Sequence, residues 1–185
     1  MSNLTKRAIT NSFMSLLNKK PLDKITVKDI VEDCGVNRNT FYYHYQDIYA
    51  LLQDVFESEM KEFVEKYRGK ENWQEGVKEA TEFALENKKA IFHVFNSMKR
   101  ELLEKYLFDV ADVLMQQVVA DRATGLNVSE EDLRYVTVFY KHAVVGIVIE
   151  WLLTGMKANP QHVIERMGEI FDGNIRYTLE KIAKK

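Results

Sequence analysis

Apolar residues recur at helical spacing along most of this chain. The first stripe runs from 5 to 19, where the apolar positions are Ala8, Ile9, Phe13, Leu16 and Leu17. Longer stripes of the same spacing follow over 48–68, 101–121 and 160–182, and this spacing is typical of helices that bury one face. Only two prolines and eight glycines interrupt the 185 residues, so the pattern predicts an all-α protein of about nine helices.

One segment, 133–153, carries apolar residues on nearly every face. A helix that is apolar all round is buried on all sides. The rest of the chain is too small to surround such a helix, so we expect a second subunit to cover it.

The stretch 26–45 predicts two short helices joined by a tight turn. Thr26 and Asn37 are residue types that accept backbone N–H groups at a helix start, and Asp29 follows Thr26 at capping-box spacing. Gly35 stands where the end of the first helix requires a positive φ. Two capped helices with a glycine-containing turn form a helix-turn-helix pattern.

The second of these helices carries more polar and aromatic side chains than packing requires. Phe41 and Tyr45 lie four residues apart and can face inward together. The remaining surface is left to Arg38, Asn39, Thr40, Tyr42, Tyr43 and His44. Hydroxyl, guanidinium and amide groups of this kind contact DNA phosphates and base edges. The alternative is an aromatic-rich packing helix in a small core.

At these residues the chain resembles the TetR/AcrR family of transcriptional regulators. The matching string is T-V-K-D-I-V-E-D-C-G-V-N-R-N-T-F-Y-Y-H-Y-Q-D, followed by A-L-L. The resemblance implies a three-helix DNA-binding head over 1–46 and a larger helical regulatory and dimerisation body over 47–185. Ile48 departs from the family, which often has a phosphate-binding lysine there.

The resemblance also implies how such a protein works. A homodimer places two recognition helices in successive major grooves of double-stranded operator DNA. In this chain Asn37, Arg38 and Asn39 would contact bases, and phosphates would be held by Thr26, Lys28, Thr40, Tyr42, Tyr43 and His44. The two subunits would pair through the helices near 133–153 and 160–182.

The body is expected to bind an effector, either a small molecule or a protein. Aromatic side chains with a few polar tips are typical of such pockets. The candidate lining residues are Phe83, His93, Phe95, Met98, Tyr106, Val110, Phe139 and His142, each of which could equally be a core residue.

Charge and composition agree with a cytoplasmic regulator. The formal net charge is −2, but residues 1–48 carry seven Lys and Arg against five acidic residues, which makes the head mildly basic. Cys34 is the one cysteine, so no intrachain disulfide can form. The N-terminus lacks the apolar run of a signal peptide, and the apolar run 143–149 is too short to span a bilayer.

Motifs of catalysis are missing from the sequence. It contains no glycine-rich phosphate loop, G-x-S-x-G, H-E-x-x-H or C-x-x-C, and neither His93 nor His142, the two histidines in apolar helices, has a second metal ligand three or four residues on. We therefore predict no enzyme activity, cofactor or metal, and a ligand- or partner-responsive repressor. The alternatives are a helical adaptor or co-activator that acts through protein partners, or a small helical enzyme without a recognisable catalytic motif.

Overall fold

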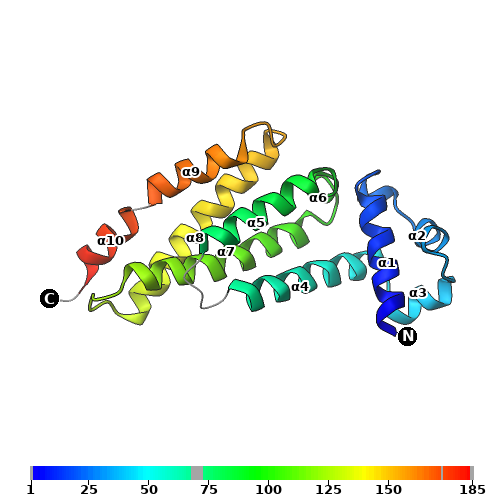
Figure 1. Ribbon diagram of the computed structural model, residues 1–185, viewed down its shortest axis with the longest axis horizontal. Coiled ribbons are helices and arrows are strands. Elements are labelled where there is room, and N and C mark those ends of the chain that lie inside the picture. The colour runs from blue at the N-terminus through cyan, green and yellow to red at the C-terminus, as the bar shows by residue number, and fades with distance from the viewer. Residues whose placement is uncertain (1, 68–72, 172, 184–185) are drawn as a thin grey trace. The chain divides into compact units, whose positions relative to one another are not determined.

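A computed structural model of the protein describes residues 2–67, 73–171 and 173–183. Within these residues the chain forms ten α-helices and one short 3-10 helix, with no strand (Figure 1). The predicted all-α class is confirmed. The helices group into two compact units, of which one contains 1–59 and 84–106 and the other 60–83 and 107–185.

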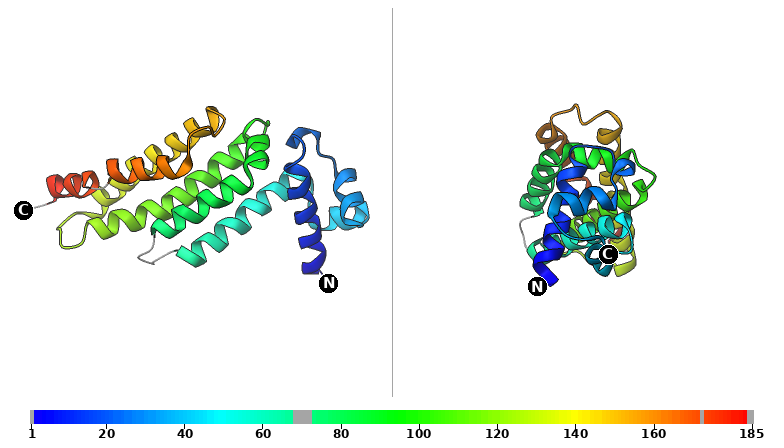
Figure 2. Two further views of the ribbon diagram at one scale, coloured as in Figure 1. Left: turned by 45° about the horizontal axis from the view of Figure 1, so that its top comes forward. Right: turned by 90° about the vertical axis from the view of Figure 1, so that its right-hand side faces the viewer.

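The first unit is built around the three helices of the head. They are gathered together in both views of Figure 2, and α4 (Ile48–Tyr67) leaves from the end of the third. The bounds are α1 (Ser2–Leu17), the 3-10 helix η1 (Leu22–Lys24), α2 (Val27–Cys34) and α3 (Arg38–His44). The almost fully buried side chains of these four elements are Ile9, Phe13, Leu17, Leu22, Ile30 and Phe41, and Leu51 and Leu52 near the start of α4 are buried to the same degree.

The predicted caps set the ends of α2 and α3. Thr26 and Asp29 form a reciprocal capping box at the start of α2. Gly35 ends that helix with φ at +69°, a conformation that costs a side chain about 1–2 kcal/mol. Asn37 then caps α3 by accepting the Thr40 N–H. These local signals hold the two helices of the predicted helix-turn-helix.

The head also packs on α6 (Lys88–Phe95), which lies in the same unit. The Ala90 N–H at the start of α6 donates to Asn18 Oδ1 at 3.3 Å. His93 Nδ1 donates to the Leu17 carbonyl at 2.7 Å. The last carbonyls of a helix have no partner within it, so the His93 side chain of α6 supplies a donor for the Leu17 carbonyl at the end of α1.

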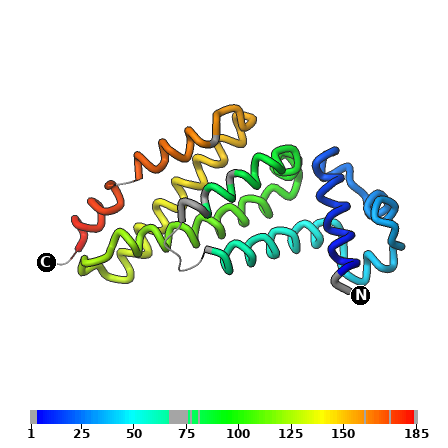
Figure 3. Tube along the Cα trace, viewed as in Figure 1, coloured from blue at the N-terminus to red at the C-terminus, as the bar shows by residue number. Residues whose placement is uncertain are grey.

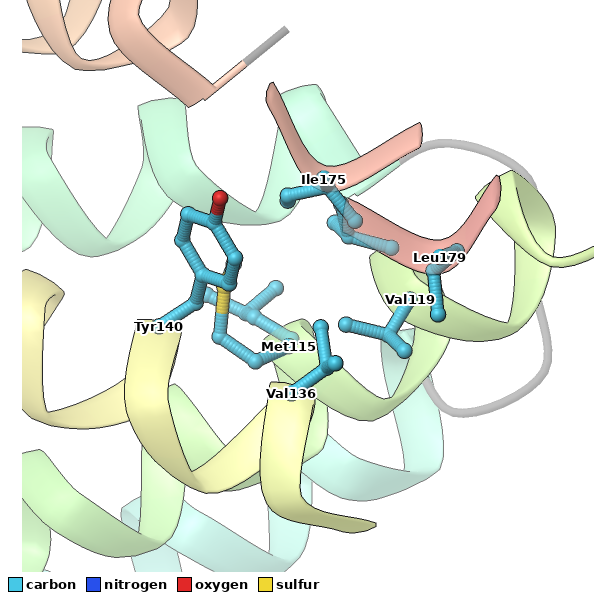
Figure 4. Packing of buried hydrophobic residues seen from close by; sticks show 8 residues of the cluster. Met115, Val119, Val136, Tyr140, Ile175 and Leu179 are labelled. Carbon is cyan, nitrogen blue, oxygen red and sulfur yellow. The ribbon is translucent and has the colours of Figure 1, made fainter. Parts of the chain in front are cut away.

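The second unit is built from helices that follow the head in the sequence. It contains most of α5 (Trp73–Glu86) and α7 (Arg100–Arg122), together with α8 (Glu130–Leu153), α9 (Pro160–Phe171) and α10 (Asn174–Ile182). Figure 4 shows side chains of α7, α8 and α10 converging on one core, namely Met115, Val119, Val136, Tyr140, Ile175 and Leu179. This core joins segments far apart in the sequence.

The prediction of a single helix over 160–182 is wrong. The trace in Figure 3 turns back after α8, and α9 then contacts it through the rings of Tyr140 and Phe171, 5.1 Å apart. The chain breaks before α10 because Gly173 has φ at +77°, outside the right-handed helical region. Continuous apolar spacing concealed this break, since α9 and α10 each keep an apolar face.

The expectation of no membrane-spanning segment rested on the run 143–149 alone. The complete α8 is long and apolar enough to cross a membrane by length and composition, a test that core helices of soluble proteins also pass. One face of α8 is buried in the second unit through Val136, Thr137, Tyr140, Val145 and Leu152.

Candidate nucleic-acid interface

The nine predicted DNA-contacting residues lie together in the helix-turn-helix. Thr26 caps α2 and Lys28 lies in its first turn, while Asn37 caps α3. The other six, Arg38, Asn39, Thr40, Tyr42, Tyr43 and His44, belong to α3 itself. We call this set of nine residues the contact surface.

The two faces of α3 differ in exposure. Phe41 is fully buried and Tyr45 nearly so, whereas Tyr42 is 56% and Tyr43 82% exposed. Two tyrosines this exposed do not belong to a packed core, so the alternative of an aromatic packing helix applies only to the Phe41 side. Arg38 and Asn39 are also exposed, which leaves their polar groups available to a partner.

One end of the Asn37 side-chain amide, its Oδ1, is used in hydrogen bonds within the head. Its Oδ1 accepts the Thr40 N–H at 2.8 Å and the Thr40 hydroxyl at 3.0 Å. Only the Nδ2 donors remain, and these match acceptors such as guanine O6 and N7 or thymine O4. The bidentate amide pairing with adenine needs both ends of the amide, and Asn39 is the residue with both ends exposed. A phosphate contact by Thr40 would require its hydroxyl to turn away from Asn37.

The Thr26 hydroxyl is likewise used in hydrogen bonds within the head. Its hydroxyl accepts the Asp29 N–H at 3.2 Å and donates to Asp29 Oδ2 at 2.7 Å, and the Thr26 N–H donates to the same oxygen at 2.8 Å. Lys20 Nζ also donates to Asp29 Oδ2 at 2.8 Å. The Lys20 ammonium, followed by the two groups of Thr26, lowers the pKa of Asp29 to about 2.

A second polar cluster ties α3 to its neighbours. The Tyr45 hydroxyl donates to Asp54 Oδ2 at 2.9 Å, and Lys6 Nζ donates to Asp54 Oδ1 at 2.7 Å. Burial raises the pKa of Tyr45 to about 12, with a further rise from Asp54, while a hydrogen bond with Thr10 acts in the opposite direction. Asp54 of α4 therefore holds the C-terminal end of α3 and the first turns of α1 together.

Ile48, the departure from the family pattern, is half-buried at the start of α4. Its side chain cannot donate to a phosphate. The Asp47 side chain caps this helix by accepting the Ala50 N–H at 2.8 Å. Asp47 and Ile48 therefore form the start of α4, and neither side chain supplies a positive charge for DNA.

Four of the predicted pocket residues lie in the first unit. Phe95 is buried there, with the Arg100 guanidinium 4.0 Å from its ring centroid, and His93 is bound to Leu17. Tyr106 stacks on Phe56 with the ring centroids 5.0 Å apart. Met98 is 78% exposed, so within one chain it is not enclosed.

The other four pocket residues lie in the second unit. Val110 packs against its core and Phe83 is half-buried. The exposed His142 lies 5.0 Å from the Phe108 ring, and Phe139 is 69% exposed. The structure therefore divides the eight residues between the two units, and a shared pocket stays a prediction. Among the residues that the structure describes, no group of three His, Cys, Asp or Glu could hold a metal ion.

Comparison with known families finds matches over both parts of the chain. A family model described as "Bacterial regulatory proteins, tetR family" matches residues 9–55. A second model, described as "Transcriptional regulator C-terminal region" and labelled as a TetR C-terminal family, matches residues 71–173. The first match contains the whole contact surface.

Two curated relatives are regulators of the helix-turn-helix type. The dhaKLM operon transcriptional activator DhaS of Lactococcus lactis subsp. lactis is 26% identical over 118 residues, which are 58% of this chain and 63% of that protein. The uncharacterized regulator YxbF of Bacillus subtilis is 31% identical over 62 residues, which are 34% of this chain and 16% of that protein. The chain thus spans less than two thirds of the length of either relative.

Solved structures share the fold over nearly the whole chain. One is described as the dihydroxyacetone kinase operon activator DhaS, with a TM-score of 0.78, 18% identity and coverage of 97% of this chain and 98% of that one. Another is NalD, described as the secondary repressor of the MexAB-OprM multidrug efflux pump in Pseudomonas aeruginosa, with a TM-score of 0.63, 19% identity and coverage of 94% and 98%.

Proposed function

Because this chain belongs to the TetR family of transcriptional regulators, we propose that it is a homodimeric repressor whose operator binding responds to an effector. The observation that carries the DNA-binding part is the exposed face of α3. Arg38, Asn39, Tyr42 and Tyr43 are exposed on a capped helix whose opposite face is anchored by Phe41. The head over 1–46 would contact DNA, and the body over 47–185 would regulate and dimerise.

On this proposal α3 enters the major groove. Base edges would be contacted by Asn37 through its Nδ2 donors, by Arg38 and by Asn39. Phosphates would be held by Lys28 and the tyrosines, together with Thr26, Thr40 and His44. The protein would act in the cytoplasm as a non-enzyme, without a cofactor or a membrane partner.

The first prediction concerns Arg38. Its replacement by alanine should weaken operator binding by about 1–3 kcal/mol and relax specificity at one base pair. The test selects bound DNA from a random pool and titrates the selected site in a gel shift with wild type and Arg38→Ala. Glu62→Lys, an exposed change on α4 outside the contact surface, serves as the control. Unchanged affinity and specificity for Arg38→Ala would remove the residue from the readout.

Dimerisation is supported by apolar groups that a single chain leaves exposed. On α8 these include Tyr135, Phe139 and Leu153, and on α9 and α10 they include Ile170 and Tyr177, each between 57% and 69% exposed. Our second prediction is a dimer at micromolar concentration in sedimentation equilibrium, because burial of such side chains stabilises association. A monomer at that concentration would contradict it.

An activator is a second candidate function. The observation in its favour is the name of the relative DhaS, an operon activator in its own organism. The two functions differ in where the selected operator lies relative to a promoter and in the sign of the change in transcription when the protein is removed. The effector, a small molecule or a protein, would be sought by native mass spectrometry of the purified dimer.

A further inference from the structure

One face of α8 forms an uncovered stripe along the helix. Residues 135, 139, 142, 146, 150 and 153 recur at intervals of four and three, which places them on one side of an α-helix. Tyr135, Phe139 and Leu153 are well exposed, and so are the positions between them. The opposite side of α8, with Val136 and Tyr140, is buried in the second unit.

The stripe has a near-palindromic order about Gly146. His142 and Glu150 lie four residues to either side of it, and Phe139 and Leu153 lie seven residues to either side. In a two-fold dimer each residue that contacts a second residue across the axis is contacted in return. A stripe whose complementary groups stand at equal distances from its centre suits an antiparallel pair of identical helices.

We propose that two copies of α8 cross antiparallel at a two-fold axis beside Gly146. This arrangement sets His142 against the partner's Glu150 and Phe139 against the partner's Leu153, each twice. The inference rests on the homodimer proposed above and adds its register and direction.

Charge complementarity selects the antiparallel direction. A parallel crossing at Gly146 would bring Glu150 beside the partner's Glu150, and like charges repel. His142 is prepared for the antiparallel contact because its Nδ1 lies 2.8 Å from the Val138 carbonyl. A carbonyl can only accept, so Nδ1 donates there and Nε2 is the nitrogen left for the partner. As an imidazolium, the ring donates Nε2–H to a carboxylate.

Gly146 suits the crossing point. The axes of packed helices approach to a distance set by the side chains at the contact. Gly146 has none, and apart from its chain neighbours and the backbone of its own helix no heavy atom of the described residues lies within 4 Å of where its Cβ would stand. A second backbone can therefore come close at this point, while the longer apolar side chains farther out fill the space between the diverging helices.

Charge exchange tests the pairing. In sedimentation equilibrium at mildly acidic pH, where imidazole side chains carry a positive charge, Glu150→Lys and His142→Glu should each raise the dimer dissociation constant about tenfold, because each sets two pairs of like charges against each other. The double variant His142→Glu/Glu150→Lys should recover most of the loss, since the exchanged charges again oppose each other. The control is Glu62→Lys on α4, which makes the same charge change as Glu150→Lys and should dimerise as wild type does.

Cross-linking tests the axis independently of charge. In a Cys34→Ser background, Gly146→Cys should form a disulfide-linked dimer on oxidation, because a residue at the axis meets its own copy within the reach of a disulfide. Chains with Phe139→Cys and chains with Leu153→Cys should cross-link when mixed and much less when separate. Glu131→Cys, near the start of α8, is the control that should stay unlinked.

The outcomes separate this inference from the function on which it rests. A wild-type monomer would overturn both. A wild-type dimer that ignores the single charge changes and fails to cross-link at 146 would overturn the register and leave the regulator proposal intact. Loss in both single variants without recovery in the double variant would overturn the antiparallel direction, as would stoichiometric binding of a different protein to this stripe.

Discussion

At the scale of single residues, the donors of the contact surface are partly used by the fold itself. The hydroxyls of Thr26 and Thr40 donate to Asp29 and Asn37. These hydroxyl bonds accompany the backbone bonds that cap α2 and α3, and they reduce the number of donors that can hold phosphate. Arg38 and Asn39 keep their full hydrogen-bonding capacity toward a partner.

Asn37 allows the capping role to be separated from DNA contact, which is our third prediction. Asn37→Asp should keep the helix cap, because Asp caps as well as Asn, but it loses the Nδ2 donors and adds a negative charge. We expect thermal stability within about 0.5 kcal/mol of wild type and operator affinity lower by about 1–3 kcal/mol.

The matched variant for this test is Asn37→Ala, which should lose both stability and affinity because it removes the cap as well. Gel-shift titration and thermal unfolding on the same preparations measure the two properties. Equal affinity for Asn37→Asp and wild type would show that Nδ2 makes no DNA contact.

At the scale of elements, short-range signals were the predictable part of the fold. The caps of α2 and α3 and the turn at Gly35 depend on residues within three or four positions of one another, so sequence spacing reveals them. The break between α9 and α10 at Gly173 was not predicted, because the apolar spacing continues through it.

Contacts between elements had no such signal. Asp54 is one of several acidic residues on the helix 48–67, yet it is the one that binds Lys6 of α1 and Tyr45 beside α3. Lys20 reaches Asp29 from the segment after α1. In none of these pairs are the two residues three or four positions apart, so only the tertiary structure identifies them.

The start of α2 gives the fourth prediction, a pH dependence. The pKa of Asp29 is about 2 in the folded protein and 3.8 for an unperturbed aspartate. A carboxyl whose folded pKa is lowered stabilises the fold above its unfolded pKa, and this contribution is lost as the pH falls toward the folded value. Urea unfolding midpoints of wild type and Asp29→Asn should therefore differ at pH 5 and converge as the pH falls below 4.

Glu32→Gln is the control for that series. Glu32 also lies on α2, but its contact with Lys28 is an exposed pair at 3.7 Å, which contributes little. Its midpoint should follow that of wild type throughout. A gap between wild type and Asp29→Asn that stays constant from pH 5 to pH 3 would argue against the ionised capping cluster.

At the scale of the whole molecule, the contact surface is poor in cations, which gives the fifth prediction. Lys28 and Arg38 are its lysine and arginine members, and Lys28 makes only an exposed contact with Glu32 at 3.7 Å. Lys6 and Lys20 are paired more closely, with Asp54 at 2.7 Å and Asp29 at 2.8 Å. A dimer would then neutralise at most about four phosphates through this surface, so log K should fall against log salt with a slope of about −4 or shallower.

Operator titrations at several salt concentrations measure that slope. A value near −8 would mean that cations outside the contact surface reach the DNA, and the exposed Arg7 and Lys24 of the head would be the first to replace. Arg38→Ala should make the slope shallower by about 2 per dimer if Arg38 touches phosphate, and leave it unchanged if it contacts only bases.

The hydrogen bonds from α6 to the end of α1 bear on how this head can be transplanted. Asn18 and the Leu17 carbonyl are bound by Ala90 and His93, and 84–106 belongs to the same compact unit as the head. A chimera that carries only the first three helices onto a foreign body would leave these groups to water or to unrelated side chains. Exchange of DNA specificity between such regulators should therefore move α6 together with the head, or restrict the exchange to the exposed residues of α3.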